Sequence, residues 1–334
     1  MSIDIFNITP HEVSRNLQGY TVLFYGEPKT GKTTIASQFP KALLLAFEVG
    51  YLAIPGIKAQ PINKWSEFKQ VLKQLKDDKA HEQFDNIIID TADICYDLCE
   101  KYICNQEGVD TINQIPYGGG YSKAGKEFDE ALRSIPQMGY GLVMISHSQD
   151  KTFKDENGEE YNQIVPTLAN RPRLIVDRMS DIIGYAHPVQ EEDGSTHTVL
   201  YMRGTPRFVA GSRFKYTPEF IEFTYDNLVN AIGDAIDKQA EAMNGKFVTD
   251  ARTDAYQKKE SPKFEDMMTE FKDLTKKIQD AAGEEFKTKW TPKITHIVDK
   301  YLGKGKKVND CTEAQSEQLE LILSDLKDAV AEGI

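Results

Sequence analysis

The 334-residue sequence predicts an α/β fold, in which helices flank a mostly parallel sheet and a small helical domain follows at the C-terminal end. Short apolar runs alternate with amphipathic helical patterns, an arrangement typical of parallel sheets. The first run leads directly into Gly-x-x-x-x-Gly-Lys-Thr at residues 26–33, the motif of a phosphate-binding loop between a strand and a helix. Three further helical patterns follow a polar stretch and predict the helical domain.

The expected strands are runs rich in apolar and β-branched residues: Thr21–Tyr25, Ala42–Phe47, Asn86–Asp90, Tyr140–Ser146, Asp181–His187 and His197–Arg203. The expected helices are Thr33–Gln38, Trp65–Lys76, Ile94–Asn105, Lys123–Ile135, Leu168–Met179 and the later part of Thr217–Lys238. In the tail we expect helices over Phe264–Ala281, Phe286–Leu302 and Thr312–Val330. The domains are therefore expected to be a P-loop core over residues 1–243, a linker over 244–263 and a helical module over 264–334.

Composition narrows the class of protein. The net charge of −12 argues against a protein that coats nucleic acid through bulk charge, although a local basic groove remains compatible with it. Three of the four cysteines fall in one expected helix, at a spacing that suits reduced thiols better than disulfides or zinc. The sequence has no membrane-span or signal-peptide pattern, so we expect a cytoplasmic protein with no membrane partner.

The P-loop predicts binding of a nucleoside triphosphate. Gly26 and Gly31 let the backbone wrap closely around a phosphate, so that N–H groups and the start of the next helix point at the anion. In this motif the lysine, Lys32, reaches the β- and γ-phosphates, and the hydroxyl of Thr33 ligates Mg²⁺. The expected nucleotide contacts are Gly26, Glu27, Pro28, Lys29, Thr30, Gly31, Lys32, Thr33 and Thr34.

Two carboxylates are expected beside the P-loop. Asp90 ends the run Asn86-Ile-Ile-Ile-Asp90, which places it at the carboxyl edge of the sheet. We expect it to lie beside Mg²⁺ together with Thr33. The next residue is Thr91 rather than a glutamate that could polarise the attacking water. We therefore expect Glu48, at the end of the second strand, to be the catalytic base; the alternative is a solvated loop carboxylate.

A third polar group follows the strand that ends at Ser146. We expect this strand to lie between the two nucleotide strands, where Ser146, His147 or Gln149 could sense the γ-phosphate through a hydrogen bond. The residues leave the choice open, and a purely structural His147 is the alternative. We include His147 among the candidate catalytic residues.

Taken in order, these motifs resemble the phage RecA-like single-strand annealing proteins, compact ATPases that keep little more than the RecA core. The residues that carry the resemblance are Tyr25–Thr34, Phe47–Glu48, Ile89–Thr91, Tyr117–Tyr121, Ile145–Ser148, Ser180–Gly184 and Ala210–Phe214. The resemblance spans roughly residues 1 to 235. It implies a RecA-like AAA/RecA-type ATPase using ATP and Mg²⁺, which binds single-stranded DNA and anneals complementary strands, commonly beside a single-strand binding protein.

Two segments are expected to contact DNA. Ile115–Lys126 combines aromatic residues for base stacking, lysines for phosphates and glycines for flexibility, although it could equally be a plain connector between helices. Gln149–Pro166 reads as a hairpin with an Asn-Gly turn, and the resemblance places it against single-stranded DNA. The candidate DNA contacts are Tyr117, Tyr121, Lys123, Lys126, Lys151, Lys154, Arg171 and Arg173.

The resemblance also implies a homo-oligomer, a ring or a filament, in which one protomer completes its neighbour's site. Arg213 matches the expected basic residue best and Arg207 second, with solvated surface arginines as the alternative. The sequence thus favours an ATP-dependent phage recombination protein in a bacterial host. A replication ATPase (a helicase or helicase loader) is the main alternative; a small-molecule kinase and a scaffold without meaningful hydrolysis are further ones. We expect the tail to serve protein contacts.

Overall fold

A computed structural model describes residues 5–251 and 262–331 of the chain. The chain divides into two compact units. Pro10–Lys258 contain the sheet, and Lys259–Ile334 contain the tail helices and group with Met1–Thr9.

The central sheet has the strand order β11-β9-β8-β2-β6-β5-β3-β4, with β10 paired to β8 and β7 paired to β6. All pairs from β8 across to β4 are parallel, whereas β7, β9, β10 and β11 pair antiparallel. The strands are β2 (Thr21–Gly26), β3 (Ala42–Ala46), β4 (Lys58–Pro61), β5 (Asn86–Asp90), β6 (Gly141–Lys154), β7 (Glu160–Pro166), β8 (Ile182–Gln190), β9 (Thr196–Tyr201), β10 (Gly211–Ser212) and β11 (Phe220–Glu222). The predicted mostly parallel sheet is confirmed.

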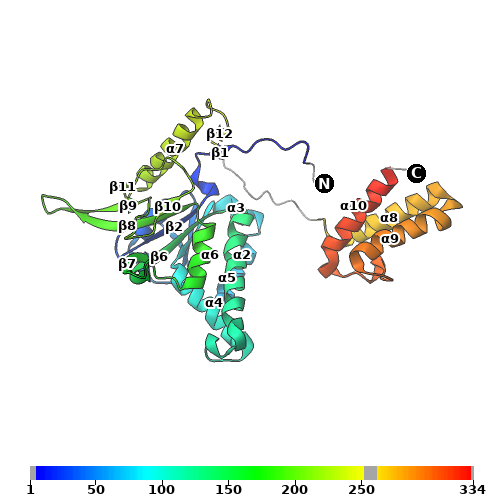
Figure 1. Ribbon diagram of the computed structural model, residues 1–334, viewed down its shortest axis with the longest axis horizontal. Coiled ribbons are helices and arrows are strands. Elements are labelled where there is room, and N and C mark those ends of the chain that lie inside the picture. Colours follow the sequence, from blue (N-terminus) through cyan, green and yellow to red (C-terminus); the bar gives the residue numbers. More distant parts are fainter. Residues whose placement is uncertain (1–4, 252–261, 332–334) are drawn as a thin grey trace. The chain divides into compact units, whose positions relative to one another are not determined.

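Helices cover both faces of this sheet (Figure 1). Side chains alternate along each strand, so Leu23 joins the core under α2, α4, α5 and α6, while Val22 and Phe24 join the core under α1 and α7. The helices are α1 (Lys32–Ala36), α2 (Trp65–Gln74), α3 (Asp78–Gln83), α4 (Ala92–Glu107), α5 (Gly119–Gln137), α6 (Asn170–Met179) and α7 (Tyr225–Glu241).

Strand β6 continues well beyond the expected end at Ser146. Its first half lies between β2 and β5, and from Ser148 onward it pairs antiparallel with β7. The turn has the expected Asn-Gly sequence, and the Asp155 carboxylate accepts hydrogen bonds from the N–H groups of Asn157 and Glu159. The predicted hairpin is confirmed, and the structure adds that it is a direct extension of a core strand.

The expected flexible loop at residues 115–126 is wrong, because α5 already begins at Gly119. The glycines serve close packing instead: a Cβ on Gly120 would lie 2.7 Å from the Ile112 carbonyl oxygen. Likewise, a Cβ on Gly125 would lie 2.6 Å from Nε of Arg171. Tertiary packing thus outweighs the low helix propensity of glycine here.

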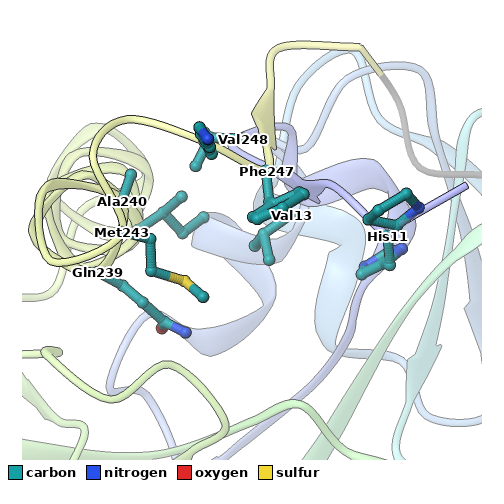
Figure 2. A pocket seen from close by; sticks show the side chains of 10 residues that line it. His11, Val13, Gln239, Ala240, Met243, Phe247 and Val248 are labelled. Carbon is teal, nitrogen blue, oxygen red and sulfur yellow. The ribbon is translucent and has the colours of Figure 1, made fainter.

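The start expected for the linker, residue 244, is also wrong. Val248–Thr249 form β12, which pairs in parallel with β1 (Val13–Ser14), and Arg15 makes ion pairs with Asp237 and Asp250. A hollow of about 270 Å³ lies where this strand pair meets the end of α7; Figure 2 shows Met243 and Phe247 at its wall. Residues up to 251 therefore pack with the sheet unit, and 252–261 lie outside the described residues.

The tail unit contains the three expected helical segments. They are α8 (Phe264–Ala282), a π-helical turn (Phe286–Trp290) that runs into α9 (Thr291–Leu302), and α10 (Ser316–Ala331). Their apolar faces meet in a separate core that buries Trp290, Ile278 and Leu319. This core explains the amphipathic spacing of the tail sequence.

Candidate nucleotide-binding site

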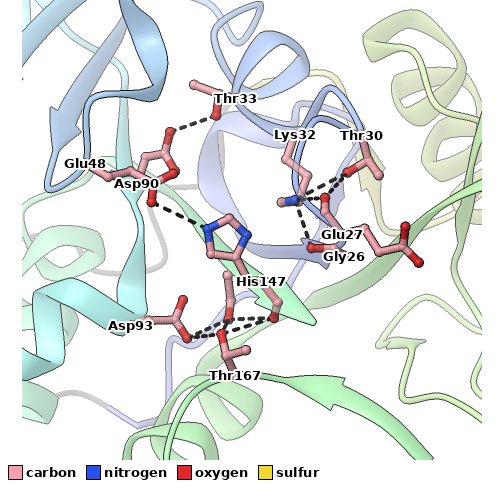
Figure 3. A network of polar contacts seen from close by, with 11 residues as sticks. Gly26, Glu27, Thr30, Lys32, Thr33, Glu48, Asp90, Asp93, His147 and Thr167 are labelled. Carbon is pink, nitrogen blue, oxygen red and sulfur yellow. Dashed lines mark hydrogen bonds and ion pairs between the residues drawn. The ribbon is translucent and has the colours of Figure 1, made fainter. Parts of the chain in front are cut away.

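The candidate site lies at the carboxyl edge of the parallel strands. The P-loop follows β2, the ends of β3 and β5 bring Glu48 and Asp90 to the same edge, and β6 passes it at His147 (Figure 3). Together with the P-loop they line a cavity of about 360 Å³. Because parallel strands all end at this edge, residues far apart in the sequence meet there.

The P-loop is tightly built around its lysine. Gly26 has φ of 157°, and a Cβ at this position would lie 2.2 Å from the Ala186 carbonyl oxygen, so only glycine fits. Lys32 is 5% exposed, and its ammonium donates to the carbonyl oxygens of Gly26 at 3.0 Å and Glu27 at 2.6 Å. Burial lowers the pKa of Lys32 to about 8, partly offset by Asp90 and Glu48. A bound phosphate would favour the charged ammonium.

Thr33 and Asp90, the two predicted Mg²⁺-side residues, lie together. The Thr33 hydroxyl donates to Asp90 Oδ2 at 2.7 Å, while Asp90 Oδ1 is buried without a hydrogen-bond partner among the described residues. Burial raises the pKa of Asp90 to about 6. A hydroxyl and a carboxylate with an unsatisfied oxygen are the hard oxygen donors that Mg²⁺ prefers, so these residues fit the ion.

Glu48 and His147 face each other across this edge. The Glu48 N–H donates to the Asp90 carbonyl oxygen at 3.2 Å, which fixes the start of the loop after β3. The carboxylate oxygen Oε2 of Glu48 lies 3.4 Å from Nε2 of His147, and both side chains are about one-third exposed, at 30% and 33%. Both groups therefore remain accessible from the cavity.

The structure separates the three polar residues that the sequence left open. His147 lines the cavity, whereas Ser146 donates to Asp93 Oδ1 at 3.0 Å and Gln149 donates to the Pro166 carbonyl oxygen. Only His147 of the three contacts Glu48 among the described residues. Its Nδ1 atom is buried without a hydrogen-bond partner in that part of the chain.

Asp93 and Thr167 form a polar contact that the sequence did not predict. Asp93 lies in the first turn of α4 and accepts hydrogen bonds from Ser146 and Thr167, while the Thr167 N–H donates to the His147 carbonyl oxygen at 2.9 Å. Burial raises the pKa of Asp93. This network joins α4, β6 and the segment after β7 beside the site. The sequence signal that could have indicated this contact is the position of Asp93, three residues after Asp90 and in the first turn of the following helix.

Arg213 lies near the amino-terminal ends of the parallel strands, whereas its own P-loop lies at their carboxyl-terminal ends. Strand β10, just before it, pairs with Ile182–Ile183 at the start of β8, whereas the P-loop residue Gly26 pairs with Ala186 near the carboxyl edge. The Arg213 guanidinium makes an ion pair with Asp181 at 2.9 Å and donates to the Arg178 carbonyl oxygen. Arg213 therefore cannot serve the nucleotide site of its own chain.

Two other arginines, Arg203 and Arg207, precede Arg213 in the sequence and lie in different surroundings. Arg203 donates to the carbonyl oxygens of Thr217 and Lys215. The carbonyl oxygen of Arg207 accepts from the N–H of Ile164 in β7, which places this exposed residue beside the hairpin. Arg203 thus holds a loop, and Arg207 lies closer to the carboxyl edge than Arg213 does.

The candidate DNA contacts on α5 lie on the outside of the sheet unit. Tyr117 is fully exposed just before the helix. The Tyr121 hydroxyl donates to Asn113, and Lys123 and Lys126 make ion pairs with Glu107 and Glu130. All four side chains are exposed, and both lysines have a carboxylate beside them.

The remaining candidate contacts lie on the hairpin and on α6. Lys151 donates to Asn170 and lies over the Phe153 ring, while Lys154 makes an ion pair with Glu160. Arg171 of α6 packs against Gly125 of α5, and Lys151 of the hairpin donates to Asn170 of α6, so the start of α6 lies between the two expected DNA segments. Arg173 makes an ion pair with Asp177 and is largely covered.

Other site types find no support in the part of the chain that the structure describes. No cluster of three or more histidine, cysteine, aspartate or glutamate side chains there could hold a metal, and all four cysteines are free thiols. Within residues 5–251 and 262–331, every helix is too short or too polar to span a bilayer.

Comparison of the sequence with known proteins shows the family of this chain. The chain is 31% identical over 339 residues to the SPbeta prophage-derived uncharacterized protein YorG of Bacillus subtilis (strain 168), covering 99% of this chain and all of that protein. The flagellar accessory protein FlaH of Methanocaldococcus jannaschii overlaps 62% of this chain and 85% of its own, with 10% identity and a TM-score of 0.33. The family model for an AAA domain matches residues 18–214, which include the P-loop, Glu48, Asp90 and His147. This chain therefore belongs to the AAA-domain family of P-loop NTPases.

Proposed function

We propose that this protein is a Mg²⁺-dependent ATPase that binds single-stranded DNA and promotes the annealing of complementary strands. One observation carries the proposal: strand β6 passes through the nucleotide site at His147 and continues without a break into the exposed β6–β7 hairpin. A contact with the nucleotide and a contact with a second ligand would thus share one strand.

The residues at the site divide the work of ATP hydrolysis. Lys32 and the P-loop N–H groups bind the phosphates, and Thr33 with Asp90 would hold Mg²⁺, which neutralises charge on the β- and γ-phosphates when bound. Glu48 accepts a proton from the attacking water, and its contact with His147 orients the carboxylate. Both side chains are partly exposed to the cavity, which allows them to contact water and the γ-phosphate.

Single-stranded DNA would contact the hairpin and the adjoining end of α5. The hairpin carries Lys151, Lys154 and Tyr161, and Tyr117 offers a fully exposed ring for base stacking. Acidic residues at the tip, Asp155 and Glu156, would repel phosphate. The stem is therefore the part that we assign to DNA.

The biological setting is part of the same proposal. The relative YorG is described as prophage-derived, which supports a phage origin, and we propose that the protein acts in the cytoplasm of a bacterial host. We further propose a homo-oligomer, in which Arg213 approaches the neighbour's site, and cooperation with a single-strand binding protein. The distance of Arg213 from its own P-loop supports a role only in another copy.

The test is ATPase rate with and without single-stranded oligo-dT, paired with annealing of complementary oligonucleotides and unwinding of a tailed duplex. We expect DNA to stimulate hydrolysis, and annealing without unwinding. Lys32→Ala, which removes the charge facing the phosphates, is the control that should lack hydrolysis. ATP-driven unwinding would instead identify a replication helicase, and the absence of both DNA stimulation and annealing would refute the proposal.

A further inference from the structure

Positive charge is concentrated in one short part of the tail unit. Residues 286–309 contain seven lysines and a single acidic residue, Asp299, in a chain whose net charge is −12. The flanking helices α8 and α10 both contain more acidic than basic residues. Over residues 264–334 as a whole, 15 acidic residues outnumber 11 basic ones, so the total charge of the tail hides this basic segment.

Part of this charge forms a stripe along α9. Lys293 and Lys300 lie two helical turns apart on one helix face, with the imidazole of His296 between them, and all three side chains are exposed. Lys289 lies about one turn earlier, in the π-helical segment. The buried residues Ile297 and Val298 anchor the other side of the helix in the tail core.

The remaining lysines lie in a turn whose backbone is fixed by hydrogen bonds. The N–H of Gly303 donates to the Asp299 carbonyl oxygen at 3.1 Å, and the N–H of Gly305 donates to Asp299 Oδ1 at 2.9 Å. Val308, 4% exposed, fixes the far end of the turn in the tail core. The one acidic side chain in the segment therefore holds the backbone of the turn that exposes Lys304, Lys306 and Lys307.

Few of these cations are neutralised. Lys300 pairs with Asp325 at 2.8 Å, and Lys289 lies 4.0 Å from Glu285. Among residues 5–251 and 262–331, no carboxylate lies within ion-pair distance of the three turn lysines. Like charges held together repel one another, so an anionic partner gains affinity at such a place.

The partner's chemistry follows from what the segment lacks. Trp290 is 2% exposed and the Tyr301 hydroxyl donates to Asp325, so neither ring is offered as a stacking platform for bases. Lysines without aromatic side chains contact phosphates and read no sequence. We propose that the basic segment, residues 286–309, binds the phosphate backbone of nucleic acid without sequence preference.

This inference deepens the proposed function, on which it rests for the choice of nucleic acid over other polyanions, and it replaces the expectation that the tail serves protein contacts. It assigns DNA affinity to the tail unit in addition to the hairpin. The two can be tested separately, because binding to the tail requires neither nucleotide nor annealing.

The experiment measures binding of the full chain to fluorescent oligo-dT by polarisation, without nucleotide, over a range of NaCl concentrations. The test variant is Lys304→Gln/Lys306→Gln/Lys307→Gln. The matched control, Lys272→Gln/Lys276→Gln/Lys277→Gln on α8, removes the same number of exposed charges elsewhere in the tail unit. Thermal melting of both variants checks that they remain folded.

We expect the turn variant to lose about 10-fold or more in affinity, and the slope of log K against log salt to fall by about 2, since each lost phosphate contact on a single strand removes about 0.7. The α8 variant should stay within about twofold of wild type. Equal effects of the two variants, or no change in the slope, would overturn the proposal. So would tight binding to phosphatidylserine vesicles combined with no binding to oligo-dT. If annealing fails while the slope behaves as expected, the proposed function falls and the tail site stands.

Discussion

The P-loop edge of the sheet and the basic segment of the tail both gather charged side chains, but they hold them in opposite ways. At the P-loop edge, Lys32 and Asp90 are 5% and 2% exposed, and each is held by short hydrogen bonds. In the basic segment the lysines lie in water, and the backbone around them is fixed by Asp299 and Val308. Burial moves pKa values at the first region, whereas exposure leaves the second to act through its summed charge.

This difference predicts how each region responds to substitution. Removing one partner of a buried polar contact leaves the other unsatisfied, so single changes at the P-loop edge should have large effects. Exposed lysines act in small, roughly additive steps.

The largest effect is expected from removing a cation that a second protomer would supply to the P-loop edge. We expect Arg213→Ala to bind ATP nearly normally but to hydrolyse it about 10³–10⁵-fold more slowly, the range that a cation supplied in trans can contribute to the rate. Mixing this variant with Lys32→Ala should restore part of the activity, measured as phosphate release. One mixed interface then pairs an intact P-loop with an intact arginine.

Asp181→Asn is the control for this prediction. It breaks the ion pair with Arg213 but keeps the arginine, and it retains an acceptor for the Thr21 N–H. If Asp181→Asn slows hydrolysis as much as Arg213→Ala does, the arginine only supports the fold. Full turnover by a strictly monomeric wild type would contradict the trans role as well.

Glu48→Gln should have the next largest effect. The amide keeps the size of the side chain but cannot accept the proton of the attacking water, so hydrolysis should fall by about 10²–10⁴-fold while ATP binding persists. Nucleotide affinity from a fluorescent ATP analogue, beside the turnover rate, separates the two. His147→Gln should cost less, because His147 acts through the Glu48 carboxylate. Normal turnover by Glu48→Gln would show that the base lies elsewhere.

A pair of truncations tests whether the two regions are independent. A chain ending at Lys258 keeps β12 and the Arg15–Asp250 ion pair, so its basal ATPase should stay within about twofold of wild type. A chain ending at Gly245 loses both, and we expect it to be less stable by roughly 1–2 kcal/mol, from lost apolar burial and hydrogen bonds. Thermal melting and phosphate release measure the two quantities. Loss of ATP binding in the longer truncation would mean that the tail belongs to the core.

The smallest effect concerns pH and Asp93. Burial raises the pKa of Asp93, so the folded state takes up this proton more readily than the unfolded state does. The resulting stabilisation is complete below the unfolded pKa, about 3.9, and is lost as the pH rises through the folded pKa. Asp93→Asn keeps an acceptor for Ser146 and Thr167 and removes the charge.

We therefore expect the free energy of unfolding to fall less steeply in Asp93→Asn than in the wild type as the pH rises above the unfolded pKa of about 3.9. Urea unfolding followed through Trp65 reports on the sheet unit, provided that Trp290, buried in the tail core, is replaced by phenylalanine in all variants. Parallel pH curves for the two proteins would contradict the assigned cost of burying Asp93.

Local sequence pattern predicted β2, β3, β5, β8, β9 and the first half of β6, together with the P-loop and the pairing of Thr33 with Asp90, because each depends on residues close in sequence or on the shared edge of parallel strands. It missed the short strands β4, β10 and β11, which carry no long apolar run. It did not predict the contacts of Asp93 with Ser146 and Thr167, which depend on how α4 meets β6. Nor did it predict that Gly120 lies inside a helix, since close packing against Ile112 cannot be read from a run of glycines. The basic segment is hidden in the composition of the tail, because the acidic residues of α8 and α10 outnumber its seven lysines.

Strand β6 also sets the kind of motion that the hairpin can make. On one side of Ser148 the strand is clamped between β2 and β5, and on the other it is paired with β7 alone. Sliding the hairpin along its own axis would break hydrogen bonds on both flanks of the clamped half. Bending at Ser148 would break others, because the N–H of Ile164 in β7 donates to the Arg207 carbonyl oxygen and the Ile164 carbonyl oxygen accepts from the Val209 N–H. The base of the hairpin is thus held on both strands, so bending is confined to the part beyond Ile164, and a pair of spectroscopic labels at Asn157 and on α5 would record its angle rather than its travel.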